Sequence, residues 1–273
     1  MPGNRLELLD RAELFFERLC ADVRAARTSC FLEFYILNQG GLVDRLITAL
    51  IEAAGRGVTC RVLLDAIGAK EFLQSPAAAR LRTAGVQLLA ALPAGLIRAL
   101  FVRIDLRNIR KIAVVGGAVA ATGRREPGDP RYFKQEEGVG EWVDAMVRVT
   151  GPVVELFTAT FMNDWLLETD CRLAEYSGRT DVHPVPPAGK ALVQLAPSGP
   201  GYVEDTIHTL LLTTLYAARR ELILTTPYFV PDNAILAALK SAAQRGVEVT
   251  VIVPEKNDSR LVHYASRARY ETL

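Results

Sequence analysis

Two segments of the chain show the same order of hydrophobic and polar positions. In each, an apolar run leads to a stretch with apolar residues three and four positions apart, then to a glycine and a second apolar run. Spacings of three and four predict a helix with one buried face, and short apolar runs predict strands. The predicted helices are Leu42–Ala53 and Ile235–Ala242, and the predicted strands are Cys30–Leu32, Cys60–Leu64, Leu222–Leu224 and Val249–Val253.

With a further helix ahead of each first strand, both copies read helix, strand, helix, strand. This alternation predicts α/β units around a mostly parallel sheet flanked by helices. Gly57 and Gly246 follow the two helices of the pattern, where a left-handed residue commonly ends a helix. A last helix is predicted between Ser259 and Leu273.

A stretch rich in proline and glycine, residues 176–190, separates the two copies and predicts an exposed linker. We therefore expect a complete first domain at 1–175 and a second domain at 191–273. The second domain is expected to be truncated, because the segment that follows the second strand of the first copy has no counterpart before Leu273. An uncovered sheet edge would then favour self-association or pairing with another chain.

Composition limits the kinds of function. The 273 residues are 50% hydrophobic and 23% charged with net charge +1, which argues against a nucleic-acid binder held mainly by electrostatics. The cysteines show no metal-site spacing, so we expect buried reduced thiols, no metal and no cofactor. No apolar run reaches the roughly 18 residues that span a bilayer, so any membrane contact of this chain is expected to be peripheral.

The most informative segment is Asp105–Gly117, in which basic residues lead directly into an apolar run. It resembles the HxKxxxxD motif of the phospholipase D superfamily, in the form found in bacterial cardiolipin synthases. Ile109 stands at the histidine position, Lys111 at the lysine position and Gly116 at the aspartate position. Further segments resemble the same family in the same order: Phe31–Ile36, Leu64–Gly68, Asp129–Gln135, Gly140–Asp144, Asp164–Trp165, Pro197–Pro200, Thr226–Pro231 and Ala265–Arg267.

The resemblance implies a phospholipase D-like fold with two domains that each give one HxK motif to a shared site. One histidine attacks a phosphodiester and forms a phosphohistidine, and the other protonates the leaving alkoxide. Lysine and asparagine meet the phosphoryl charge, and no metal is required. The implied reaction moves a phosphatidyl group between two phosphatidylglycerols, with phospholipid headgroups as partners, on the cytoplasmic side of the inner membrane.

The chain departs from the family pattern at the positions that carry this chemistry. Ile109 offers no lone pair to act as a nucleophile, and Gly116 has no side chain to orient an imidazole. The family's Gly-Ser-x-Asn is replaced by Gly123–Glu126, which puts a carboxylate where phosphate is expected. We therefore expect a degenerate motif and a pseudoenzyme.

Lys111 is the surviving motif residue, and the resemblance implies that it binds phosphate together with Arg110. The alternative is a solvated basic loop beside a strand. Glu33 interrupts an apolar run, and its position in the family implies a carboxylate that supports the site. The alternative is a strand-end charge that faces solvent. The histidines, His183, His208 and His263, lack HxK spacing, so a replacement nucleophile is not expected.

Four functions stay open. The first is a phosphatidyltransferase of the cardiolipin synthase type that is inactive in this chain. The second is an enzyme that is active only with a separate chain supplying an intact HxK half. The third is a non-catalytic phosphate-binding or lipid-binding partner that regulates an intact paralogue. The fourth is a phospholipase D-type phosphodiesterase or nuclease. The apolar segment Leu88–Val102, followed by arginines, is interpreted as a membrane-facing loop or as a strand with a core helix.

Overall fold

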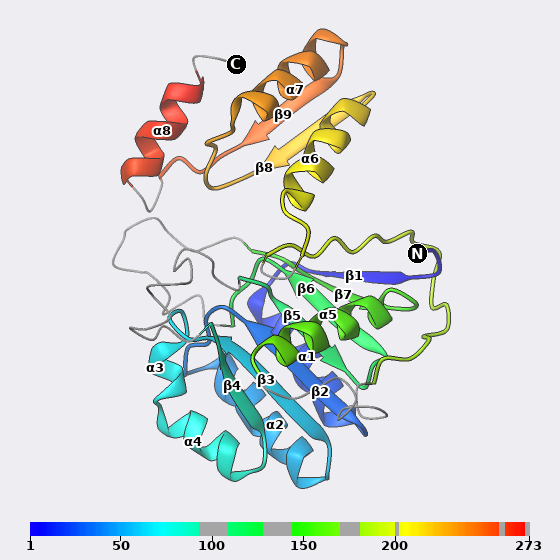
Figure 1. Cartoon of the computed structure of the whole chain (residues 1–273), viewed down its shortest axis with the longest axis vertical. Coiled ribbons are helices and arrows are strands. Elements are labelled where there is room, and N and C mark those ends of the chain that lie inside the picture. The colour runs from blue at the N-terminus through cyan, green and yellow to red at the C-terminus, as the bar shows by residue number, and fades with distance from the viewer. Residues whose placement is uncertain (93–108, 128–143, 170–180, 200–201, 257–259, 271–273) are drawn as a thin grey trace. The chain divides into compact units, whose positions relative to one another are not determined.

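The computed structural model describes residues 1–92, 109–127, 144–169, 181–199, 202–256 and 260–270 (Figure 1). The chain divides into two compact units. Among the described residues, the first unit ends at Leu195 and the second begins at Ala196. The first unit contains the Lys111 region, and the second contains the later copy of the repeat.

The first unit alternates strands and helices. Its strands are β1 (Arg5–Leu9), β2 (Ser29–Phe34), β3 (Thr59–Asp65), β4 (Gln87–Ala91), β5 (Ile112–Val115), β6 (Val119–Gly123) and β7 (Met146–Thr150). Its helices are α1 (Ala12–Ala25), α2 (Leu42–Gly55), α3 (Lys70–Leu73), α4 (Pro76–Thr83) and α5 (Val154–Leu167).

The described strands of this unit form one seven-stranded sheet in the order β1-β7-β6-β5-β2-β3-β4. β2, β3 and β4 run parallel, whereas the pairs from β2 through β5, β6 and β7 to β1 are antiparallel. The predicted mixed α/β architecture with flanking helices is confirmed. The expectation that its sheet is mostly parallel is wrong for this unit.

The antiparallel half follows from a tight connection. β5 turns directly into β6 through Gly116 and Gly117, whose φ angles are +57° and +59°. Glycine adopts this left-handed backbone without steric cost, so the chain reverses within a hairpin. The parallel prediction came from strands joined by helices, and β5 and β6 have no helix between them.

Alternate residues of β2 face two different helix layers, and all six are buried. Every second residue from Cys30 to Phe34 packs in the core that includes α1, α2 and α4. Phe31 packs on the opposite face, where its ring stacks on Phe161 of α5 with centroids 4.9 Å apart. Figure 1 shows α5 lying across that face of the sheet. Because side chains alternate along a strand, Glu33 lies on the Phe31 face and enters the α5 layer.

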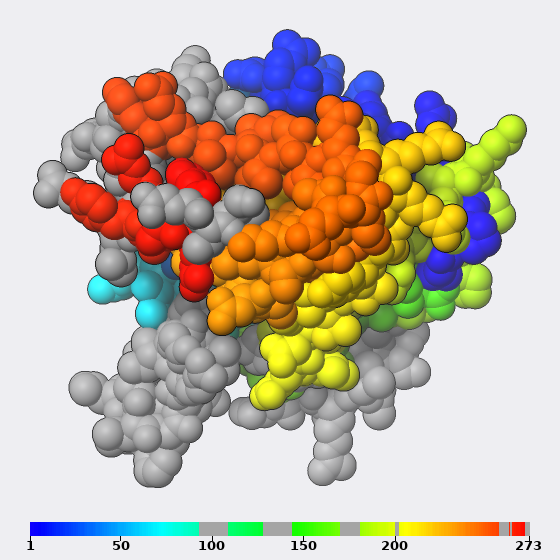
Figure 2. Space-filling model, turned by 90° about the horizontal axis from the view of Figure 1, so that it is seen from above, coloured from blue at the N-terminus to red at the C-terminus, as the bar shows by residue number. Residues whose placement is uncertain are grey.

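The second unit repeats the order of the first. α6 (Thr206–Ala217), β8 (Glu221–Thr225), α7 (Asn233–Gln244) and β9 (Glu248–Ile252) correspond to α1, β2, α2 and β3, and α8 (Arg260–Tyr270) follows. β8 and β9 pair in parallel, with α6 and α7 side by side against one face (Figures 1 and 2). The helices and strands predicted for the two copies are confirmed, as are the left-handed Gly57 (φ +86°) and Gly246 (φ +84°).

Each copy also uses an arginine in the same way. Nη2 of Arg56 donates to the carbonyl of Arg24 at the end of α1 (2.9 Å), and Nη2 of Arg245 donates to the carbonyl of Tyr216 at the end of α6 (3.2 Å). The last carbonyls of a helix have no partner within the helix, so each arginine satisfies one and holds the two helices of its copy together.

The end of the predicted linker and the residue that follows it, Ala191, pack on the first unit, and the amides of Ala188 and Gly189 donate to the carbonyl of Gly3. Asn4 and Ala191 form an antiparallel bridge, with backbone hydrogen bonds of 3.1 Å and 2.8 Å. The structure therefore sets the unit boundary after Leu195, later than the 176–190 linker that composition indicates. Backbone pairing of this kind leaves no trace in proline and glycine content, which is why the pattern did not reveal it.

None of the described helices is both long and apolar enough to cross a membrane. The proposed membrane-facing segment Leu88–Val102 lies mostly within residues 93–108, outside the described residues. Cys20, Cys30 and Cys60 are buried with free thiols, as predicted.

Asn4→Ala should destabilise the first unit. Asn4 is fully buried, its Oδ1 accepts from the backbone amide of Val153 (2.9 Å), and its Nδ2 donates to the carbonyl of Met1 (2.7 Å). Alanine would leave the Val153 amide without a partner, at an expected loss of about 1–3 kcal/mol in the free energy of unfolding. Urea unfolding followed by circular dichroism measures this. Leu192→Ala, at a side chain that is 78% exposed, is the control and should change stability by less than about 0.5 kcal/mol; equal effects of the two substitutions would contradict the prediction.

Candidate functional site

Three strands bring the candidate residues to one edge of the first sheet. Glu33 lies near the end of β2, Lys111 directly precedes β5, and Glu126 follows β6. β5 is antiparallel to both neighbours, with Ile112 opposite Glu33 on one side and Thr122 on the other. The start of β5 therefore lies beside the ends of β2 and β6, so the side chains of Glu33, Lys111 and Glu126 come to the same edge.

A buried ion cluster lies on the α5 face of this edge. Nη1 of Arg110 lies 2.8 Å from Oδ2 of Asp164 in α5 and 3.9 Å from Oε1 of Glu33. The side chains of Arg110, Glu33 and Asp164 are 13%, 1% and 4% exposed. The solvent-facing alternative for Glu33 is therefore wrong. A buried carboxylate is costly unless it is paired, so the position of Glu33 requires a cation such as Arg110.

The Asp164 carboxyl of this cluster holds its proton more tightly than an exposed carboxyl does. Burial raises the pKa of Asp164 above its usual range, and the Arg110 guanidinium and a hydrogen bond with Glu33 offset part of that rise. Two carboxyls share one guanidinium, which favours a retained proton between them. Because Arg110 already lies beside the carboxyls of Glu33 and Asp164, the geometry favours Lys111 over Arg110 as a ligand for phosphate.

The ammonium group of Lys111 already contacts other groups of the protein. Its Nζ lies 2.7 Å from Oε1 of Glu126, donates to the carbonyl of Ile109 (2.7 Å), and lies 5.9 Å from the centre of the Tyr35 ring. Oε2 of Glu126 accepts from the backbone amide of Ile36 (3.0 Å). The Lys111 side chain is 14% exposed, so the alternative of a solvated basic loop is wrong. Glu126 occupies the position that an anion would take.

Two further arginines of this edge contact Asp144, one at its carboxylate and one at its backbone carbonyl. Arg124 lies 3.4 Å from Oδ1 of Asp144, and Arg125 donates to the carbonyl of the same residue. Burial raises the pKa of Asp144, while Arg124 and Arg125 lower it. Among the described residues, Lys111 and Arg124 are therefore each paired with a carboxylate, whereas a phosphate site needs positive charge that is available to the anion.

Ile109 and Gly116, the positions that the resemblance assigns to the histidine and aspartate of the motif, flank opposite ends of β5. Ile109 is beside Lys111 and is 63% exposed. Gly116 lies at the opposite end of β5, where its amide donates to the carbonyl of Ser29 (2.9 Å). An acidic side chain at Gly116 would meet Thr28 rather than the Lys111 cluster, because the Oγ1 of Thr28 is 3.7 Å from the position of an added Cβ. The structure thus separates Gly116 from the residues with which the motif groups it.

Comparisons with known proteins now identify the family. The family model described as "Cardiolipin synthase, PLD-like domain" matches residues 211–273. Over 273 residues the chain is 44% identical to cardiolipin synthase A of Yersinia pseudotuberculosis serotype O:1b (strain IP 31758), a match that covers 100% of this chain and 56% of the relative. The chain belongs to the cardiolipin synthase family. It spans little more than half the length of these relatives, and the protein of the same name from Yersinia pestis gives the same figures.

Solved structures agree with this family at the level of the fold. The phosphatidylserine synthase of Haemophilus influenzae Rd KW20 superposes with a TM-score of 0.59 at 16% identity, covering 91% of this chain and 61% of that one. The polyphosphate kinase of Porphyromonas gingivalis gives a TM-score of 0.55 at 14% identity, covering 94% and 36%. At these identities the likeness concerns the fold alone.

At this edge, sequence reasoning singled out Lys111, Arg110 and Glu33 but did not single out Asp144 and Asp164. Both carboxylates stand in segments that resemble the family, and Asp164 interrupts an apolar helix, which is the signal that could have found it. The described residues contain no group of three or more His, Cys, Asp or Glu side chains arranged to hold a metal ion.

Glu126→Gln should create an anion site at Lys111. The amide keeps the size of the side chain and an oxygen for the Ile36 amide, but it removes the charge that neutralises the ammonium. We expect the affinity for sulfate to rise about tenfold or more, because a charge-assisted hydrogen bond becomes available to the anion. Isothermal titration calorimetry at fixed ionic strength measures the change.

Glu17→Gln is the matched control, since it removes the same charge from an exposed position on α1. Burial raises the pKa of Glu126 above its usual range. Its carboxylate therefore gains a proton sooner as the pH falls, and sulfate binding by the unmodified chain should increase through that pH range but stay flat in Glu126→Gln. Equal sulfate affinity in Glu126→Gln and in Lys111→Gln/Glu126→Gln would contradict this account.

Proposed function

We propose that this chain is a member of the cardiolipin synthase family that does not transfer phosphatidyl groups and acts instead as a binding partner. Its ligands are phospholipid headgroups such as that of phosphatidylglycerol, met peripherally at the cytoplasmic side of the inner membrane. Its protein partner is a second copy or an intact relative that supplies complete chemistry.

The residue at the nucleophile position carries the proposal. Ile109 cannot form a bond from nitrogen to phosphorus, so the phosphohistidine route has no first step there. Among histidines with described side chains, His183 contacts a neighbouring carbonyl and His208 lies 2.6 Å from Asp232 in the second unit. A phosphodiesterase or nuclease of the superfamily would need the same nucleophile, so the same observation weighs against that alternative.

The contacts that Lys111 makes with Glu126 and the Ile109 carbonyl support a binding role over a catalytic one. Glu126 and the Ile109 carbonyl already satisfy the ammonium, so a phosphate must displace a carboxylate that is held by two contacts. Such a site can bind an anion weakly and in a pH-dependent way, but it lacks the preorganised positive charge that stabilises a phosphoryl transition state.

The purified chain should form no cardiolipin from phosphatidylglycerol vesicles. Ile109 leaves the phosphodiester without an attacking group, so product should stay at the level of heat-killed protein. Mass spectrometry of extracted lipids measures the product, with an intact cardiolipin synthase as the positive control. Cardiolipin above the heat-killed level would overturn the proposal.

Two variants give this assay a matched pair. Ile109→His alone and Ile109→His/Gly116→Asp should behave alike, because Gly116 lies at the far end of β5. Neither should sustain multiple turnover. A phosphohistidine detected by mass spectrometry in both would agree with this placement, whereas turnover only in the double variant would contradict it.

The exposed face of the β8–β9 sheet supports pairing with another chain. Ile223 and Ile252 are 57% and 49% exposed, and the register sets Ile223 beside Thr250 and Ile252 beside Thr225 on that face. In the first unit the corresponding β2 is buried on both faces, with α5 against one of them. A partner that covers the β8–β9 face would remove both isoleucines from water and satisfy the free strand edges.

Ile223→Thr/Ile252→Thr should weaken self-association of the full chain. Threonine keeps the β-branched shape that suits a strand while reducing the apolar area of the face. Analytical ultracentrifugation over a concentration series measures the effect. Leu8→Thr on β1, at a side chain that is 63% exposed, is the control and should leave association unchanged. If the unmodified chain has the mass of a monomer at every concentration, the prediction of self-association is contradicted.

A further inference from the structure

Two buried cysteines lie side by side in the first sheet. Cys30 of β2 and Cys60 of β3 are register partners on neighbouring parallel strands, and both enter the core that includes α1 and α2 (Figure 1). Neighbouring strands lie about 4.8 Å apart, which is inside the range of roughly 4.4–6.8 Å between Cα atoms that a disulfide needs. The strand register therefore brings together two thiols that share no local motif.

The two thiols act directly on each other. A hydrogen bond from the Cys30 thiol lowers the pKa of Cys60, burial opposes this change, and the Arg56 guanidinium adds to it. The same hydrogen bond raises the pKa of Cys30, and burial raises it further. The pair is thus unsymmetrical, because Cys60 forms the thiolate more readily while Cys30 keeps its proton.

Arg56 is fixed close to this pair. Its Nη2 donates to the carbonyls of Val23 (3.3 Å) and Arg24 (2.9 Å) at the end of α1. From there the guanidinium lowers the pKa of both cysteines. A cation held near a thiol stabilises the thiolate, which is the form that reacts as a nucleophile.

The second copy of the repeat shows that the fold does not require sulfur at these positions. Leu222 and Val249 are the corresponding register partners of β8 and β9. Arg245 contacts the end of α6 there as Arg56 contacts the end of α1. Because two apolar side chains serve the same construction, the thiol pair is a feature of the first copy rather than of the repeat.

The pair lies one residue inside the amino end of each strand. Ser29 begins β2 and Thr59 begins β3. The backbone amide of Thr59 donates to the carbonyl of Thr28 (2.9 Å), and Thr28 and Arg56 in the adjoining loops are exposed. Strand ends open locally at a lower cost than global unfolding, so such an opening gives a small oxidant access to both thiols.

We propose that Cys30 and Cys60 form a reversible disulfide when the protein meets a peroxide. The Cys60 thiolate attacks one oxygen of hydrogen peroxide, the O–O bond breaks, and the departing hydroxide takes up the proton that Cys60 released, which leaves a sulfenic acid and water. The Cys30 sulfur then attacks the sulfenic sulfur, and its proton leaves with the displaced hydroxyl as a second water. Two thiols are oxidised and one peroxide is reduced. The reaction involves neither Lys111 nor the second unit, so it is independent of the function proposed above.

A tryptic map of the peroxide-treated full chain tests the pair. The native protein is treated with hydrogen peroxide, alkylated, digested without reductant and analysed by mass spectrometry. Trypsin places the two cysteines in separate peptides, residues 28–45 and 57–61. We expect these peptides to be joined by a disulfide that dithiothreitol reverses. Cys20 of α1, which is 1% exposed, is the internal control and should stay largely unlinked.

Trapping of the sulfenic acid with dimedone distinguishes the roles of the two thiols. Cys30→Ser keeps a hydrogen-bond donor but removes the sulfur that closes the disulfide, so Cys60 should be labelled. In Cys60→Ser the labelling of Cys30 should be several-fold weaker. Circular dichroism checks that each variant is folded, and the tryptic map of the unmodified chain decides the question if one is not. Absence of the linked peptide in the native chain, its appearance only after unfolding in urea, or equal amounts of linkage to Cys20 would overturn the proposal.

Discussion

The burial of β2 on both faces is the constraint on which the first unit depends. A strand whose alternate residues must all leave water needs a helix layer on each side, and α1 and α2 supply one while α5 supplies the other. The same alternation carries Glu33 into the α5 layer, where a lone carboxylate would be prohibitively costly. Arg110 and Asp164 complete a hydrogen-bonded cluster around it, and this cluster fixes the backbone immediately before Lys111.

Electrostatic balance at this edge then determines what the site can do. Glu126 neutralises Lys111, the residue that the family resemblance assigns to phosphate, and Asp144 pairs with Arg124. Arg125 donates to the backbone carbonyl of Asp144. Phosphoryl transfer depends on fixed positive charge that is already in place before the substrate arrives. The paired charges of Lys111 and Arg124, together with isoleucine at the position that the resemblance assigns to the nucleophile, are the observations on which the proposed non-catalytic role rests.

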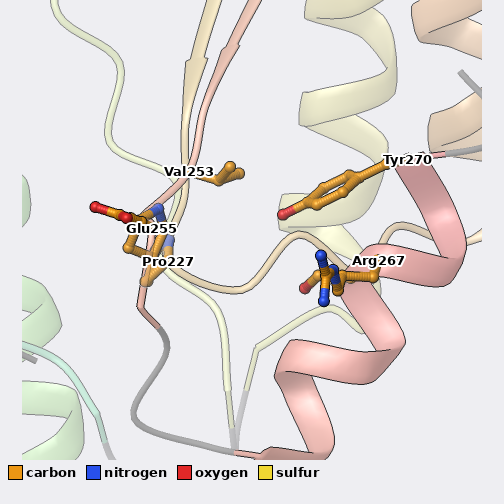
Figure 3. A pocket seen from close by; sticks show the side chains of 7 residues that line it. Pro227, Val253, Glu255, Arg267 and Tyr270 are labelled. Carbon is orange, nitrogen blue, oxygen red and sulfur yellow. The ribbon is translucent and has the colours of Figure 1, made fainter.

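The two copies of the repeat share their local construction and differ in what surrounds it. Arg56 and Arg245 close the same helix pair in each copy, and Gly57 and Gly246 end the same helix. The first copy is extended by the antiparallel β5–β6 hairpin and covered by α5, whereas β8 and β9 leave one face exposed. The second unit has a pocket beside α8, at the carboxyl end of β8 and β9 (Figure 3).

The sequence by itself determined the local elements, because helix and strand periodicity and the glycines that end helices act over a few residues. α2, β3, α7 and β9 were predictable in this way. Only the tertiary structure decided the antiparallel half of the sheet, the attachment of the segment near Ala191 to Asn4, and the partners of the charged residues. Arg110 and Asp164 are 54 positions apart, and Glu126 reaches Ile36 across 90 positions. Strand register and helix packing set such contacts, and no short-range pattern in the chain encodes them.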